Sequence, residues 1–179
     1  NGGTVKRIFI MLVVFGTLLL LAAYVLGLSV REVTTADAAA RAGLRWHMLT
    51  ALAAICFASL VHAIWLTYFM GTGRWMEETC RAYGLPDDFP AENHSMKYGT
   101  IPAIAGVFLL LLVTGGFGAA VDPGSSVKFT GWAGFSGAMI HFLLASTALG
   151  ANAIVNFIEY QTISRNNHLI NQVMDEVRR

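Results

Sequence analysis

Three histidines in apolar surroundings are the side chains of this sequence best suited to chemistry inside a membrane. His47 and His62 stand fifteen residues apart in one apolar run, and His141 lies in a later one. An imidazole at such a position is able to ligate haem iron, to contact a quinone or to relay protons. A haem b held by two histidines would take His62 together with His141 or His47. Each histidine also has a simpler interpretation: His62 and His141 as hydrogen-bonded packing residues, and His47 as an interfacial side chain.

A polar stripe follows His141 along the same run. Asn152 lies eleven residues further on, a separation that turns a helix by about 1,100°, or about 20° beyond three full turns. Asn156 and Glu159 continue on nearly the same face. The stripe predicts either a path for protons or a quinone, or asparagines that hydrogen-bond between helices at about 0.6 kcal/mol each.

A basic and aromatic group closes the run that contains His62. Tyr68, Arg74 and Trp75 lie where the apolar character ends, as expected of side chains that contact a lipid or quinone headgroup. The alternative is an ordinary interfacial belt that anchors the helix. The Gly-x-Gly of Gly71 and Gly73 is too short to cradle a phosphate and follows no predicted strand.

Residues 62–75, with the tail 171–179, resemble uncharacterised bacterial four-span membrane proteins that share a His, Tyr-Phe, Gly-Thr and Arg-Trp pattern. The resemblance implies a membrane location. It also implies that His62, Tyr68, Gly71, Arg74 and Trp75 matter to the protein, and it implies no activity.

The elements that must position these side chains are membrane helices. Only 13% of the 179 residues are charged, against about a quarter in soluble domains. Four uncharged stretches, each long enough to cross a bilayer core of about 30 Å, occupy residues 8–30, 46–73, 98–121 and 131–158. The sequence therefore predicts an all-α integral membrane protein with one membrane domain over residues 1–179, a bundle of four transmembrane helices.

The second and fourth helices are expected to continue beyond the membrane. The second should end at Gly84 and Pro86, because glycine and a following proline terminate helices. Residues 86–96 then form an irregular loop, and Pro102 falls in the first turn of the third helix, where a missing amide donor costs little. Residues 159–179 form an amphipathic cytoplasmic tail.

The fourth helix is predicted to lie inside the bundle, because small and amide side chains let membrane helices approach closely. Its packing residues are Gly134, Ala138, Ser146, Gly150, Asn152 and Asn156. Apolar residues recur at helical spacing along the tail and are expected to bind a partner or a second copy of the chain. They are Ile163, Ile170, Val173, Met174 and Val177.

Several classes of function are excluded. The segments between the spans are too short for a soluble catalytic domain, and no catalytic constellation is present. A net charge of +1 without a basic block argues against nucleic-acid binding. Cys56 and Cys80 give neither a metal motif nor a covalent haem motif, and no metal ion site is expected.

Positive charge sets the expected orientation. Eight of the twelve Lys and Arg residues lie at the two termini and in the loop after the second span, and four lie in the other two loops. The excess places both termini in the cytoplasm, in what is expected to be a bacterial cytoplasmic membrane.

Three functions remain open. The leading one is a non-enzymatic membrane subunit that packs within a larger complex, bound to lipids and to other subunits. The alternative is a b-type haem or quinone-binding cytochrome subunit that uses the intramembrane histidines. A small channel or transporter comes third, because the acidic residue nearest the interior of a span, Glu159, lies at its edge.

Overall fold

The computed structural model describes residues 2–30, 38–122 and 126–179, and four long helices dominate them. They are α1 (Gly2–Ser29), α2 (Ala38–Tyr83), α3 (Asp88–Ala120) and α4 (Gly137–Val177). Each is long and apolar enough to cross a membrane. The predicted all-helical fold with four candidate spans is confirmed.

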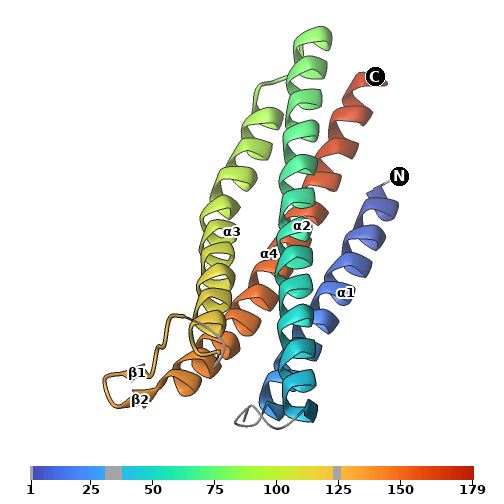
Figure 1. Ribbon diagram of the computed structural model, residues 1–179. Helices are drawn as coiled ribbons and strands as arrows, with labels where there is room; N and C mark the ends of the chain where they lie inside the picture. Colours follow the sequence, from blue (N-terminus) through green and yellow to red (C-terminus); the bar gives the residue numbers. More distant parts are fainter. Residues whose placement is uncertain (1, 31–37, 123–125) are drawn as a thin grey trace.

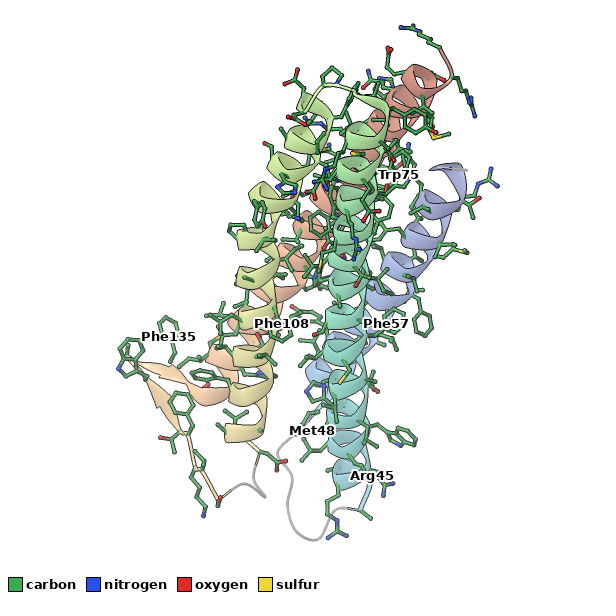
Figure 2. All side chains as sticks on the ribbon, turned by 90° about the horizontal axis from the view of Figure 1, so that it is seen from above. Arg45, Met48, Phe57, Trp75, Phe108 and Phe135 are labelled. Carbon is green, nitrogen blue, oxygen red and sulfur yellow. The ribbon has the colours of Figure 1, made fainter. Side chains whose placement is uncertain are left out.

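Both chain termini and the α2–α3 turn lie at one end of the bundle, which we call the terminal end (Figure 1). The opposite end carries a two-stranded antiparallel hairpin, β1 (Gly131–Trp132) and β2 (Phe135–Ser136), and we call it the hairpin end. Helix α2 runs the full length between them, with Arg45 near the hairpin end and Trp75 toward the other (Figure 2).

The start of α4 differs from the sequence-based prediction. Residues 131–136 form the hairpin instead of helix, and Gly134 is a turn residue rather than a helix-packing residue. Three positive φ angles within four residues explain this: 143° at Gly131, 52° at Ala133 and 83° at Gly134. No α-helix accommodates such angles. Ser136 then caps α4, because its hydroxyl accepts from the amide of Met139 at 3.2 Å.

The α2–α3 connection is much shorter than predicted. Helix α2 ends at Tyr83 as expected, because Gly84 adopts a φ of 65° and the amide of Leu85 bonds back to the carbonyl of Cys80 at 2.9 Å. Helix α3 already begins at Asp88, so residues 88–96 are helical and the expected irregular loop is wrong. Pro90 occupies the first turn, where a proline costs little, and Pro102 lies in the interior of the helix.

The main apolar core lies in the half of the bundle toward the terminal end. Trp65, Phe69 and Met76 of α2 are fully buried there against Phe9 of α1 and Ile163 of α4. A smaller cluster of Ala58, Leu111 and Ala148 joins α2, α3 and α4 nearer the hairpin end. Smaller side chains there leave space between the helices.

Candidate functional site

Two of the three histidines predicted as ligands meet in the half of the bundle toward the hairpin end. His47 of α2 and His141 of α4 approach each other with ring centroids 6.2 Å apart and ring planes inclined by 74°. Both side chains are partly buried. Two facing helices therefore present one imidazole each at the same depth.

The ring of His47 is held by α1. Its Nδ1 atom lies 2.9 Å from the backbone carbonyl of Ala23, which accepts its proton. A Cβ atom placed on Gly27 would come within 2.8 Å of the same ring, so a glycine is required at this contact. Histidines that bind metals commonly donate one ring N–H to a carbonyl, which leaves the other nitrogen available as a ligand.

The ring of His141 packs against α3, but its buried Nδ1 atom has no hydrogen-bond partner within the described part of the chain. A Cβ atom on Gly118 would lie 2.9 Å from its Cε1 atom, and the backbone of Thr114 lies beside the imidazole. Each histidine thus sits against a glycine of a neighbouring helix. All four helices contribute to the placement of the pair.

A cavity opens beside the two imidazoles. Its volume is about 330 Å³, and a smaller cavity of about 70 Å³ shares Tyr24, His47, His141 and Ala145 with it. Met48, labelled in Figure 2, also lines the larger one. The hydroxyl of Tyr24 lies 3.0 Å from that of Ser146, which ties α1 to α4 at the wall. Sites for small cofactors measure roughly 300–1,000 Å³.

The donor set restricts what the pair can hold. In residues 2–30, 38–122 and 126–179 no three His, Cys, Asp or Glu side chains converge as a metal site. Zinc would need about four protein or water ligands. Haem iron takes four nitrogens from the porphyrin and needs only two axial ligands from the protein, so two imidazoles suffice.

His62 has a different environment, in the middle of the bundle. Its Nδ1 atom lies 2.9 Å from Oε1 of Glu159, and its Nε2 atom lies 3.2 Å from Oδ1 of Asn152. The three side chains are 3%, 0% and 3% exposed, in the order His62, Glu159 and Asn152. Both ring nitrogens are occupied, and Asn152 is eleven residues, or about 16 Å of helix, from His141. The structure therefore does not bring His62 and His141 together.

The hydrogen bonds of His62 with Glu159 and Asn152 restrict where protons can lie among these three side chains. Both ring nitrogens face oxygen atoms, and Nε2 donates to Asn152. The bond to Glu159 then forms either between imidazolium and carboxylate or between a neutral imidazole and a protonated carboxyl group. Both arrangements have zero net charge, which explains how a carboxyl group is accommodated at a fully buried position.

A second polar cluster, which we call the amide cluster, joins α2, α3 and α4 nearer the terminal end. Asn93 donates to Asn166 at 2.8 Å, Asn166 donates to Thr72 at 2.9 Å, and Tyr68 donates to Asn167 at 2.7 Å. Sequence reasoning placed Asn93 in a loop and Tyr68 at a lipid headgroup, and it missed the cluster. The signal available was the Asn166-Asn167 pair in a helical tail.

The other predicted site residues are dispersed. Arg74 is exposed and pairs with Glu78 at 2.9 Å, and Trp75 packs against the apolar core. Ala138 lines the histidine cavity and Gly150 is exposed. Ile163 and Val173 are buried within the chain's own bundle, and Ile170 packs against its core. Met174 and Val177 are partly buried. The burial of the tail is thus explained largely by this chain, and partner binding there stays a prediction.

No known protein family, curated protein or solved structure matches the chain.

Proposed function

We propose that this chain is a membrane-bound b-type cytochrome subunit that holds one haem between His47 and His141. The observation that carries the proposal is the approach of two imidazoles from facing helices beside a cavity, with centroids 6.2 Å apart. An imidazole nitrogen binds a metal at about 2 Å, and its ring centroid lies about 1 Å further away. Two imidazoles on opposite sides of one iron thus have centroids roughly 6 Å apart.

The surrounding residues support the same function. Ala23 fixes the Nδ1 atom of His47, and Gly27 and Gly118 leave room for the rings. Haem bound here would supply one-electron transfer between ferrous and ferric iron. His47 and His141 would both ligate the iron and would leave no open position for oxygen, which favours electron transfer over oxygen chemistry.

We also propose that the chain is a subunit of a larger membrane complex. An electron carrier needs a donor and an acceptor, and other subunits of such a complex would supply them. A cytoplasmic location of both termini rests on the distribution of Lys and Arg and belongs to the same proposal. Purification in mild detergent and identification of stoichiometric partners tests the complex.

The haem proposal is tested by the absorbance of the full chain, expressed in membranes with added haem precursor and purified. We expect a sharp α-band in the reduced-minus-oxidised spectrum and about one extractable haem per chain. His47→Ala and His141→Ala should each abolish the band. The double variant His62→Leu with Glu159→Leu is the matched control and should retain it, because no buried carboxyl group then loses its partner. A flat wild-type spectrum, or a band lost in this folded control and kept in His47→Ala and His141→Ala, would refute the proposal.

A further inference from the structure

The histidine pair lies near one end of the bundle. His47 is nine residues from the start of α2, and His141 is four residues from the start of α4, which corresponds to about 14 Å and about 6 Å along the helix axes. In the other direction, 36 residues separate each histidine from the end of its helix, at Tyr83 or Val177, a length of about 54 Å. The pair is thus displaced strongly toward the hairpin end.

The larger cavity beside the pair is displaced in the same direction. All four helices line it with residues from their turns nearest the hairpin end, and the lining residues Val30 and Asp122 lie just past the ends of α1 and α3. Toward the terminal end the main core fills the bundle, and Trp65, Phe69 and Met76 are fully buried there. A haem held by the two histidines would therefore lie close to one end and be separated from the other by packed side chains.

The rest of the bundle offers no second redox centre among the residues that the structure describes. Both ring nitrogens of His62 are occupied. His94 bonds Glu77 at 2.9 Å, and His168 is exposed. No three His, Cys, Asp or Glu side chains in the described part of the chain converge as a metal site. An electron on a haem between His47 and His141 would thus find no intermediate centre toward the terminal end.

Distance decides which end of the bundle can exchange electrons. Electrons cross packed protein by tunnelling, and the rate of tunnelling falls exponentially with distance. A path of about 54 Å along α2 without an intermediate centre is effectively closed. The buried indole of Trp65 lies on the way, but oxidation of an indole requires a potential far above those of haem proteins. Only the half of the bundle toward the hairpin end is close enough to the site.

We infer that the haem exchanges electrons only in the half of the bundle toward the hairpin end, and that this chain by itself does not carry electrons across the membrane. The inference rests on the proposed cytochrome function. It means that the electron donor and the electron acceptor are both one-electron carriers that dock in this half of the bundle.

A photoactive ruthenium complex tethered to one cysteine at a time tests which end exchanges electrons. Cys56→Ser with Cys80→Ala removes the native thiols. Arg45→Cys and Tyr83→Cys are matched attachment points, because both residues are exposed on α2 and lie two and 36 residues from His47. After a flash the excited complex gives one electron to ferric haem, and a sacrificial amine reduces the oxidised complex again. We expect haem reduction from Arg45→Cys, and from Tyr83→Cys none above that of unlabelled protein.

Sealed vesicles test transport across the membrane with the unlabelled chain. They contain the haem-loaded wild-type protein, with ferricyanide trapped inside and hexaammineruthenium(II), which does not cross lipid, outside. Each ruthenium ion that is oxidised would supply the one electron that reduces one ferricyanide. We expect no more reduction of trapped ferricyanide than in vesicles with His47→Ala, which lacks a haem ligand under the cytochrome proposal.

Two results would overturn the inference: equal rates of haem reduction from the two tethered complexes, or reduction of trapped ferricyanide that depends on haem. The α-band and the haem content are recorded on the same samples before either measurement. Wild-type protein without a band would refute the cytochrome proposal and this inference with it. A normal band together with rapid transfer from Tyr83→Cys would refute this inference alone.

Discussion

Helix α2 carries two histidines fifteen residues apart. Their surroundings differ in a way that separates the proposed haem ligand, His47, from His62. His47 has one nitrogen fixed by the carbonyl of Ala23 and faces His141 beside a cavity. His62 has both nitrogens occupied, by Glu159 and Asn152, and is 3% exposed. A histidine becomes available to a cofactor when one nitrogen and some space remain, and burial in the membrane alone does not achieve this.

The largest expected effect on stability comes from His62, because its removal leaves a fully buried carboxyl group without its hydrogen-bond partner. His62→Leu leaves the fully buried Glu159 without its partner and should lower the free energy of unfolding by about 3–5 kcal/mol. Denaturation of the purified protein in detergent, followed by circular dichroism, measures the loss. The double variant His62→Leu with Glu159→Leu should recover much of it. Loss of the haem band in folded His62→Leu would remove the distinction between the two histidines.

Gly118→Ala tests how closely the ring of His141 packs against α3. The new Cβ would lie 2.9 Å from the ring of His141, and such overpacking costs about 1–3 kcal/mol. We expect haem affinity to fall about tenfold, measured by haem titration of the apoprotein. Gly116→Ala on the same helix has open space around its Cβ and serves as the control. Equal affinity of the two variants would show that the imidazole tolerates displacement.

The amide cluster should respond more weakly than His62. Tyr68→Phe removes the hydroxyl that donates to Asn167 and accepts from Asn166, at an expected cost of about 0.5–1.5 kcal/mol. Thermal unfolding measures the change, and Tyr98→Phe at an exposed position is the control. An unchanged midpoint for Tyr68→Phe would mean that the neighbouring amides pair without it.

Arg74→Ala should have the smallest effect. Its pairing with Glu78 is exposed, with side chains 81% and 62% accessible, and water screens such pairs. We expect no change in melting temperature or haem spectrum. A fall in purified yield that phospholipid restores would instead support the predicted lipid contact of Arg74.

The four spans could be predicted because uncharged stretches of membrane length leave few alternatives. The end of α2 could be predicted as well, since Gly84 and Pro86 are local signals. The predicted start of α4 is wrong. Small residues at helical spacing indicate a helix there, and the sequence gives no sign of the three positive φ angles at Gly131, Ala133 and Gly134. Residues 88–96 are predicted as a loop because Pro86 and Pro90 favour a break, but Pro86 precedes α3 and Pro90 lies in its first turn.

The site was less accessible to sequence reasoning. His47, His62 and His141 were recognised as candidates, but their pairing depends on how far α2 and α4 are shifted along each other. That offset is set by contacts such as those of Trp65 with Thr162 and His62 with Glu159. Asn93 shows the same limit, because its partners Thr72 and Asn166 come from other helices.

The hairpin at the start of α4 carries side chains that would set the depth of the bundle in a membrane. Trp132 and Phe135 are 77% and 54% exposed, and Phe135 projects away from the helices (Figure 2). Aromatic rings of this kind prefer the boundary between lipid and water. The hairpin leads directly into α4 at Gly137. If its aromatic rings lie at the boundary, they fix how deeply α4 enters the membrane. A deletion or insertion between Trp132 and Gly137 would raise or lower His141 relative to the membrane surface.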